Sequence, residues 1–452
     1  MDDTKLDSML AELKMMRSTR PQGRVCGVQP DGIMVSGLGR FARIGDRVEI
    51  NIAGGACLSG EIVSLRESHL VVLPDGPSDG VSLGDAALLS PDLKIFPCDA
   101  WKGRVIDPNG KSMDNQPLPR GSTGLRVYRD PPNAVYRKRL GQRLDTKMAV
   151  LNTLLPIVAG QRIGLFAGSG VGKTSLLGHL AAHMQADVVV IALIGERGRE
   201  VRDFIDRTLG PEGMARSIIV AATSDQPALT RRQCAYTAMT IAEYFRDLGC
   251  SVLFLADSIT RLAEAHREVA VSAGEPPSLR GFPPSMTHMI TSLCERAGPG
   301  VDGSGDITGV FSVLVAGSDM DEPVADTLRG VLDGHIILDR SIAETGRYPA
   351  IDVVRSVSRS LPHAASEDEN SMIQRARALL SSYSKSETMI RAGLYSEGND
   401  PTLDQAMRVH KDFEVFLAKL EERGIPASFQ ALQSIIRSAE AYAHAAKRPS
   451  IR

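Results

Sequence analysis

Residues Ala167-Gly-Ser-Gly-Val-Gly-Lys-Thr174 directly follow the apolar run Ile163-Gly-Leu-Phe166 and precede Ser175-Leu-Leu177. This order predicts a strand, then a glycine-rich turn, then the first turn of a helix. In such a turn the backbone N–H groups point inward and surround phosphate oxygens, and the helix N-terminus adds positive potential. Ala167 stands where the phosphate-loop pattern has its first glycine, and a methyl group disturbs that position little. The stretch predicts a phosphate-binding loop; the alternative is an ordinary glycine-rich turn with a chance lysine.

Two side chains at the end of this loop have expected roles of their own. Lys173 is placed to reach the outer phosphates, and the Thr174 hydroxyl is placed to ligate Mg²⁺. The residues expected to line the phosphate site are Gly168, Ser169, Gly170, Val171, Gly172, Lys173, Thr174 and Ser175.

The composition limits the class of protein without naming it. A chain of 452 residues usually forms two or three domains, and 43% hydrophobic residues suffice for a sizeable core. The 52 basic and 54 acidic residues nearly cancel, which argues against a strongly basic nucleic-acid binder. The six scattered cysteines indicate free thiols in a reducing compartment. Because no apolar run approaches 18 residues and Met1-Asp-Asp-Thr4 does not begin a signal peptide, we expect a cytoplasmic protein that can sit against a membrane through a partner.

Four regions follow one another along the chain. Residues 1–20 predict an amphipathic helix that packs either on its own domain or on a partner; its apolar face comprises Leu6, Met9, Leu10, Leu13 and Met16. Residues 21–93 hold short β-rich runs between turn signals, typical of a sandwich or barrel, and we predict a small β-barrel. Residues 94–375 alternate strands and helices, which predicts a parallel sheet with crossover helices. Residues 376–452 predict a helical domain.

The expected elements can be stated by residue number. The short runs of the barrel are 23–28, 32–35, 47–50, 60–63 and 70–73. The expected strands of the parallel sheet are 162–166, 188–194, 217–221, 252–256 and 310–315, with helices between them such as 173–184, 198–209 and 230–247.

Two strands deliver acidic residues to the sheet edge where ligands collect. Ser251-Val-Leu-Phe-Leu-Ala-Asp257 is an apolar strand that ends in a carboxylate, which can hold the Mg²⁺ shell or cap the next helix. Val190-Ile-Ala-Leu-Ile-Gly195 is followed by Glu196-Arg-Gly-Arg-Glu200, which is either part of the site or a solvated turn. Glu196 comes first after the strand and is best placed to orient an attacking water. Arg197 can meet the γ-phosphate, whereas Glu200, one turn into the helix, suits a helix-face ion pair.

Together these residues resemble a known family, the ATPases shared by rotary ATP synthases and type III protein export. The resemblance spans nearly the whole chain in order and rests on 167–174, Gly195-Glu-Arg-Gly-Arg-Glu-Val201, Asp257-Ser-Ile-Thr-Arg-Leu262, Gly274-Glu-Pro-Pro277, Glu295-Arg-Ala-Gly298, Asp319-Met-Asp-Glu-Pro-Val-Ala-Asp326, Leu332-Asp-Gly-His-Ile336 and Tyr348-Pro-Ala-Ile-Asp352. The catalytic subunit of the rotary synthase carries threonine in place of Gly198, whereas Leu394-Tyr-Ser-Glu-Gly-Asn-Asp400 resembles the export branch. The flagellar export ATPases are the nearest match and the injectisome ATPases come second.

The resemblance implies a RecA-like core, ATP and Mg²⁺ as ligands, and a role for each matching residue. Lys173 and Thr174 bind phosphate and Mg²⁺, Asp257 holds the Mg²⁺ shell, and Glu196 activates water. Arg197 and Arg261 lie near the phosphates. Tyr348 stacks on adenine, unless it is a core tyrosine before a proline turn. Arg359, in Ser356-Val-Ser-Arg359, is the arginine finger given to a neighbouring subunit.

The same resemblance implies the partners. A chain that carries both the phosphate loop and the finger can close a head-to-tail ring, and six is the family's number. The loop 273–284 faces the central hole and a stalk protein, or is a plain surface connection. The helical domain contacts chaperone–cargo complexes, the N-terminal helix contacts a stator-like regulator, and the ring works at an export gate membrane protein against the inner membrane.

Three functions remain in competition at this point: an export ATPase, a subunit of a rotary ATP synthase, and a ring-shaped RNA translocase of the transcription-terminator type. Near-neutral charge and only eleven Phe and eight Tyr count against RNA, because stacking platforms are scarce. We therefore expect no nucleic-acid partner.

Overall fold

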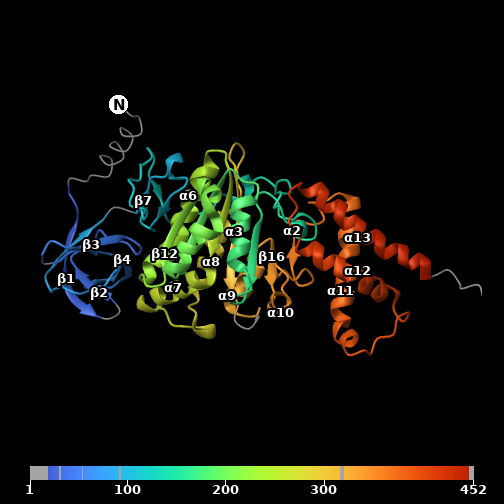
Figure 1. Cartoon of the computed structure of the whole chain (residues 1–452). Helices are drawn as coiled ribbons and strands as arrows, with labels where there is room; N and C mark the ends of the chain where they lie inside the picture. The colour runs from blue at the N-terminus through green and yellow to red at the C-terminus, as the bar shows by residue number, and fades with distance from the viewer. Residues whose placement is uncertain (1–18, 30–31, 53, 91–92, 316–319, 447–452) are drawn as a thin grey trace, which may run out of the picture.

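The computed structural model describes residues 19–29, 32–52, 54–90, 93–315 and 320–446. A small barrel, a central α/β domain and a helical domain follow one another along an elongated molecule (Figure 1). The helix expected over 1–20 lies outside the described residues except for its last two. Of these, Arg20 belongs to the barrel, because its guanidinium donates to Glu49 (2.7 Å) and Ser90 (2.6 Å).

Six antiparallel strands close the barrel in the order β1-β2-β5-β4-β3-β6. Alternate residues such as Val48 and Ile50 point inward and are fully buried, as period-two strands require. The sequence predicted five of the strands and missed the short sixth, which pairs with both β1 and β3 and so closes the barrel. The strands are β1 (Gln22–Gln29), β2 (Gly32–Ser36), β3 (Arg47–Asn51), β4 (Cys57–Leu65), β5 (Leu70–Pro74) and β6 (Ala86–Leu89).

A largely parallel sheet in the order β17-β16-β10-β15-β13-β11-β12-β8 forms the central domain, and β14 pairs with β15 at its margin. All five strands expected here are present, whereas β8, β14, β16 and β17 had not been predicted. The strands are β8 (Val105–Ile106), β10 (Arg162–Ala167), β11 (Val188–Glu196), β12 (Ser217–Thr223), β13 (Ser251–Asp257), β14 (Gly298–Pro299), β15 (Asp306–Leu314), β16 (Gly334–Leu338) and β17 (Val357–Ser358); β7 (Lys94–Ile95) and β9 (Leu125–Arg126) form a separate pair.

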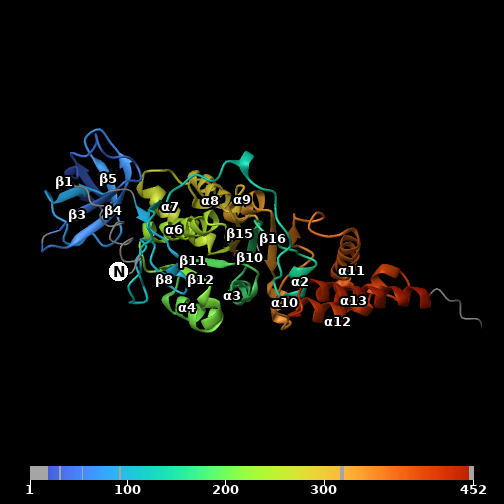
Figure 2. The same ribbon diagram turned by 90° about the horizontal axis from the view of Figure 1, so that it is seen from above.

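Helices cover both faces of this sheet (Figure 2). Because β11 is covered on both faces, nearly all its residues are apolar and buried, which explains the continuous apolar run 188–194. One face carries α6 (Ala228–Asp247), α7 (Ile259–Ser272), α8 (Ser285–Arg296) and α9 (Pro323–Val331); the other carries α3 (Lys173–His183), α4 (Gly198–Asp203) and α5 (Gly210–Ala215). Short helical segments elsewhere are η1 (Asp99–Trp101), η2 (Ala134–Tyr136), α2 (Ala149–Asn152), η4 (Leu279–Gly281) and α10 (Arg340–Glu344).

The helix expected over 198–209 is not continuous. It ends as an α-helix at Asp203 and continues as one turn of π-helix, η3 (Phe204–Leu209). Phe204 and Leu209 lie five residues apart and are both buried. A π turn, with its i→i+5 bonding, brings that spacing onto one face, which explains the departure from the α geometry.

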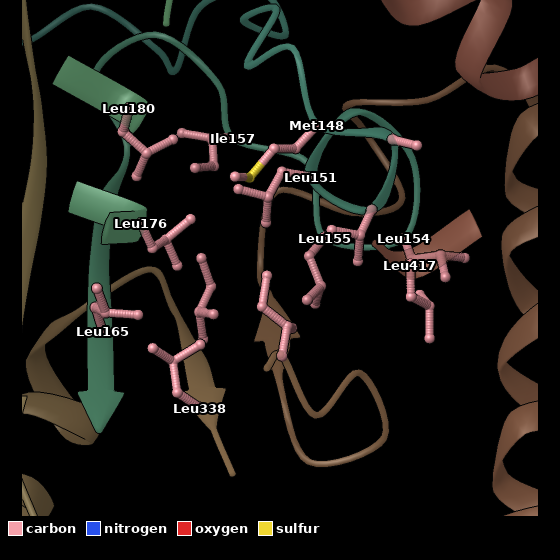
Figure 3. Packing of buried hydrophobic residues seen from close by; sticks show 14 of the residues in the cluster. Met148, Leu151, Leu154, Leu155, Ile157, Leu165, Leu176, Leu180, Leu338 and Leu417 are labelled. Carbon is pink, nitrogen blue, oxygen red and sulfur yellow. The ribbon is translucent and has the colours of Figure 1, made fainter. Parts of the chain in front are cut away.

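The helical domain consists of α11 (Glu367–Arg391), α12 (Pro401–Leu417) and α13 (Ile425–Ala446). The expected boundary after residue 375 falls inside α11, which begins earlier because Ser366 and Glu369 form a capping box. Leu417 of α12 and Leu338 of β16 belong to one buried cluster that also contains Leu151 and Leu176 (Figure 3). The helical domain therefore packs on the central domain through a shared hydrophobic core.

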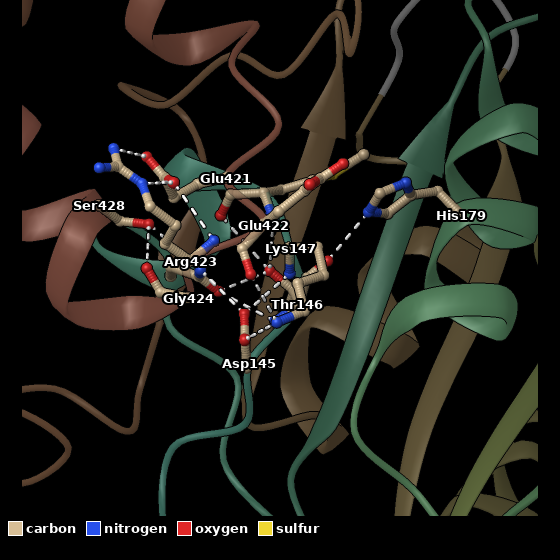
Figure 4. Close-up of polar contacts among 11 residues, drawn as sticks. Asp145, Thr146, Lys147, His179, Glu421, Glu422, Arg423, Gly424 and Ser428 are labelled. Carbon is tan, nitrogen blue, oxygen red and sulfur yellow. Dashed lines mark hydrogen bonds and ion pairs between the residues drawn. The ribbon is translucent and has the colours of Figure 1, made fainter.

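Polar contacts reinforce this junction (Figure 4). The Lys147 ammonium donates to Asp145 (2.5 Å) and to the Glu422 carbonyl (3.1 Å), and the Glu421 amide donates to the Lys147 carbonyl (2.9 Å).

Among the described helices, none is both long and apolar enough to cross a membrane.

Candidate active site

The glycine-rich turn connects β10 directly to α3, as the sequence predicts. Gly170 (φ 78°) and Gly172 (φ 89°) both adopt the left-handed conformation, which glycine takes without steric cost. Gly172 is the N-cap of α3, and glycine has no side chain to accept from the first helical N–H groups. Val171 between them is buried and anchors the loop in the core. The loop thus presents backbone donors at a helix N-terminus, a ready-made anion site.

Lys173 meets two carboxylates that come from different strands. Its ammonium contacts Asp257, the last residue of β13, and lies 3.9 Å from Oε1 of Glu196, the last residue of β11. Asp257 is held in turn by Ser312 of β15, whose hydroxyl donates to Oδ1 (2.9 Å). The carboxyl ends of β10, β13 and β11 therefore gather a cation and two carboxylates at one point.

A β-bulge directs Glu196 toward Lys173. The register between β11 and β12 shifts between Ile194 and Glu196, and the intervening Gly195 has φ 67°. Simple alternation would turn Glu196 to the same face as Ile194, the face that α6 covers. The extra residue changes that direction, as bulges beside active sites commonly do.

The environment of Glu196 makes its carboxyl a weaker acid than usual. Burial raises its pKa to about 7, and the nearby carboxylates of Asp257 and Glu200 act in the same direction, while Lys173 opposes them. A general base is most effective when its pKa lies near the working pH. The site therefore tunes Glu196 to the range in which it can accept a proton near neutrality.

The two other arginines assigned to the site are placed differently. The Cβ of Arg261 packs beside Gly195, and its guanidinium donates to Glu264 (2.9 Å). Its pKa is raised by that contact and also by Glu196 and Glu200 nearby. Arg197 points into solvent, with 74% of its side chain exposed, and pairs with Glu200 at 3.4 Å. Arg261 therefore lies beside the Glu196 carboxylate, whereas the Arg197 side chain points away from it.

Tyr348 lies against the phosphate loop, although 176 residues separate it from Gly172. A Cβ built on Gly172 would approach the Tyr348 ring to 3.2 Å. The tyrosine is 52% exposed, so part of its side chain remains accessible. A base-stacking residue needs such a position, against the phosphate loop and partly open to solvent.

Arg359 lies at the opposite end of the sheet. Its amide donates to the Asp333 carbonyl (3.0 Å), and the Asp333 amide donates to the carbonyl of Arg162, the first residue of β10. The phosphate loop begins after the last residue of β10, five residues further on. At about 3.3 Å per residue this separation is about 16 Å, more than an arginine side chain spans. Arg359 is exposed, and its guanidinium donates to the Arg329 carbonyl (3.2 Å).

The residues present fit a nucleotide with a divalent cation. The left-handed Gly170 and Gly172 shape a cradle that leaves the N-terminus of α3 uncovered by a side chain. Lys173 supplies a positive charge, and Thr174 and Asp257 supply the hydroxyl and carboxylate oxygens that Mg²⁺ prefers. The chemistry of this donor set matches the expectation for ATP and Mg²⁺.

Two contributions escaped the sequence reasoning. Ser312 positions Asp257, and its signal was a single hydroxyl in the middle of the apolar run 310–315. Glu200 had been assigned only a helix-face ion pair, which it does form with Arg197, yet it also raises the pKa of Glu196. The first effect depends on β13 and β15 being neighbours, whereas the second is local, because Glu200 follows Glu196 by four residues.

Two family models match successive parts of the chain. The model of the ATP synthase alpha/beta family nucleotide-binding domain matches residues 147–358, and that of the T3SS EscN ATPase C-terminal domain matches residues 365–434. The flagellum-specific ATP synthase of Caulobacter vibrioides is 43% identical over 443 residues, covering 95% of this chain and 99% of the relative.

Solved structures give the same result for the fold. The assembled ATPase EscN of the enteropathogenic E. coli type III secretion system matches with a TM-score of 0.83 and 35% identity, over 92% of this chain and 100% of the other. EscN in complex with its central stalk EscO matches with a TM-score of 0.82 and 36% identity, over the same shares. The RecA-like fold class expected from the sequence is confirmed.

Proposed function

The chain belongs to the ATP synthase alpha/beta family, in the branch of type III protein export ATPases, and we propose that it hydrolyses Mg²⁺-bound ATP between neighbouring subunits of a ring to drive flagellar protein export. The identity of 43% to a flagellum-specific relative, against 35% to EscN, favours the flagellar over the injectisome assignment.

In the proposed reaction a water oxygen forms a bond to the γ-phosphorus while the bond to the β–γ bridging oxygen breaks, releasing ADP. Glu196 polarises the water and accepts its proton. Lys173 and the loop N–H groups hold the phosphates, and Tyr348 holds the adenine. Thr174 and Asp257 hold Mg²⁺, which when bound neutralises charge on the phosphates. Arg261 stabilises negative charge on the phosphates beside Glu196. Arg197 can reach the phosphates only after its ion pair with Glu200 breaks.

The proposal of a ring rests on one observation: Lys173 and Arg359 lie at opposite ends of β10. Arg359 cannot serve the phosphate loop of its own chain, whereas a head-to-tail neighbour can bring the amino end of its sheet to that loop. A finger supplied in this way stabilises the charge that develops in phosphoryl transfer and is typically worth about 10³ to 10⁵ in rate. EscN was solved as an assembled ATPase, which supports the same arrangement, and six subunits is the number we propose.

The remaining assignments complete the proposal. The loop 273–284 contacts a central stalk protein, by analogy with the EscN–EscO complex. The N-terminal helix expected over 1–20 docks on a stator-like regulator, and the helical domain meets chaperone–cargo complexes. The ring works in the cytoplasm, against the inner membrane at an export gate protein, and no nucleic acid takes part.

A mixing experiment tests the shared site. Arg359→Ala and Lys173→Ala subunits are each expected to hydrolyse ATP at a small fraction of the normal rate. Mixed before assembly, they form interfaces that pair an intact loop with an intact finger, so the activity exceeds the sum of the two parts. A finger that acts within its own chain would give no such gain.

The matched control is Arg340→Ala mixed with Lys173→Ala. Arg340 is an exposed arginine on α10 that pairs with Glu344 (3.1 Å). The rate of this mixture should be proportional to its content of Arg340→Ala subunits, which keep an intact loop, and should show no gain beyond that. Equal gains in both mixtures would refute the role of Arg359.

A further inference from the structure

Residues 346–360 form a single segment that leads from the phosphate loop of its own chain to the finger. Tyr348 lies at one end, against Gly172, and Arg359 lies at the other, beside Asp333. We propose that two residues of the helical domain, Glu414 and Arg377, are positioning residues for this segment: Glu414 sets Tyr348 for the site of its own chain, and Arg377 sets Arg359 for the site of the neighbour.

At the first end, Arg347 links Tyr348 to α12. The Arg347 guanidinium donates to the carbonyl of Ile351 (3.1 Å), which folds the segment into a tight loop with Tyr348 exposed on it. The same guanidinium forms an ion pair with Glu414, whose Oε2 lies 2.9 Å from Nε. The Arg347 side chain is 8% exposed and the Glu414 side chain is 37% exposed, so a buried guanidinium meets a carboxylate that still reaches solvent. Glu414 therefore holds the residue directly before Tyr348.

At the second end, Arg377 of α11 binds the segment three residues before the finger. Its guanidinium donates to the carbonyl of Ser356 (2.9 Å). The buried Ser356 also accepts from the amide of Ile337 in β16 (2.9 Å) through its hydroxyl. Arg377 thus clamps the chain onto β16 at the point from which β17 and Arg359 continue.

Between these two contacts the segment lies beside open space. A cavity of about 970 Å³ separates it from α11 and α12, and its lining includes Arg347, Asp352, Tyr383, His410 and Glu414. The middle of the segment is nevertheless held by packing, because Ala350, Ile351 and Val353 are buried. The two polar anchors therefore act on its ends, and the helical domain is a firm base for them because it shares a hydrophobic core with the central domain. Loss of either anchor loosens the end that it holds, and about 1 Å of misplacement can cost on the order of a hundredfold in rate.

This inference rests on the proposed roles of Tyr348 and Arg359. Given those roles, substitutions of Glu414 and Arg377 should change different kinetic constants. Adenine is held in the ground state, so Glu414→Ala should raise the KM for ATP and weaken ADP binding about tenfold, the order of one base–aromatic stack, with kcat nearly unchanged. The finger acts on charge that develops in the transition state, so Arg377→Met should lower kcat about tenfold or more with ADP binding unchanged. Arg377→Lys, which keeps a donor, should restore part of kcat.

Mixing with Lys173→Ala subunits separates the two anchors further. Arg377→Met subunits have an intact loop, and Lys173→Ala neighbours supply well-placed fingers, so the mixture should regain activity. The Glu414→Ala defect lies in the site of its own chain, so its raised KM should persist in the mixture. A merely structural role for either residue would move both kinetic constants together and show no such difference.

Matched controls lie in the same helical domain. Arg375 is on α11 two residues before Arg377, but its guanidinium donates to Gln405 of α12 rather than to the segment. Glu387 pairs with Arg391 on the surface of α11 (2.6 Å). Arg375→Met and Glu387→Ala should leave kcat, KM and ADP affinity within about twofold of the parent.

The outcomes distinguish this inference from the function on which it rests. Normal hydrolysis by Arg359→Ala would overturn the proposed finger itself. Loss of hydrolysis in Arg359→Ala with a normal kcat in Arg377→Met would leave the finger intact and overturn the positioning role of Arg377. A normal KM and ADP affinity in Glu414→Ala, beside a raised KM in Tyr348→Ala, would overturn the role of Glu414.

Discussion

At the carboxyl end of the central sheet the charged groups meet within one chain, whereas at the amino end Arg359 meets a backbone carbonyl and solvent. The Lys173 side chain is 10% exposed and lies among Asp257, Glu196 and the loop donors. The Arg359 guanidinium rests on the Arg329 carbonyl. A buried cation needs a partner charge to offset its desolvation, while an exposed one stays available to a charge from outside. Under the proposed function, each subunit therefore contributes the loop of one site and the finger of another.

The largest expected effect is at the carboxyl end. Lys173→Ala removes the cation that bridges the outer phosphates, so hydrolysis should fall by about 10³ or more, while ATP binding weakens less. The melting temperature should change little, because the loop lysine adds little to the hydrophobic core. Steady-state ATPase assays, ATP titrations and thermal unfolding measure the three quantities.

The control for this substitution is Lys411→Ala, which removes an exposed lysine on α12. It should behave like the parent protein in all three assays. Full ATPase activity in purified Lys173→Ala would mean that the glycine-rich turn is not the phosphate site, and the contrast between the two ends of the sheet would disappear.

The next largest effect distinguishes the role of Glu196, which lies near Lys173, from that of Glu200. Glu196→Gln keeps the size of the side chain but cannot accept a proton, so turnover should fall by about 10² to 10³ with ATP binding retained. Glu200→Gln should retain most of the activity, because its carboxylate acts on Glu196 rather than on the reacting water. Turnover lost in Glu200→Gln and kept in Glu196→Gln would reverse the assignment.

A pH profile sharpens the same comparison. Glu196 must be ionised to act, and its pKa is raised to about 7, so kcat/KM should fall as the pH drops through about 7. Glu200 raises that pKa, so Glu200→Gln should move the acidic limb to lower pH. ATP ionises identically in both assays, so a shift between the two profiles belongs to the protein. Superimposed profiles would show that Glu196 does not control the limb.

The smallest effect on catalysis is expected far from both ends of the sheet. Deletion of 1–18 should leave ATP hydrolysis within about twofold and reduce capture of a stator-like regulator from the same organism, because the apolar face of 1–20 is removed. The deletion stops before Arg20, which binds Glu49 and Ser90 in the barrel. Pull-down and thermal unfolding measure the result. A large drop in melting temperature with capture intact would mean that the helix packs on its own domain.

Local sequence signals were enough to predict the fold class, the order of the domains and the charged residues at the strand ends. These features are local: a glycine-rich turn after an apolar strand, alternation of strand and helix, and a carboxylate at the end of an apolar run all act within a few residues. Elements with weak local signals escaped, such as β6, whose four residues carry no clear alternation, and the two-residue β17.

Which of these groups meet depends on the packing of the whole domain. Glu196, Asp257 and Ser312 come together because β10, β15, β13 and β11 are neighbours in that order, and nothing local specifies this order. The bulge at Gly195 turns Glu196, and the return of the chain from Leu338 brings Tyr348 back to Gly172. The same strand order places Arg359 at the far end of β10, since β17 runs antiparallel to β16. A sequence records which residues are present, but the distance between residues far apart in the chain is set by the packing of the whole sheet.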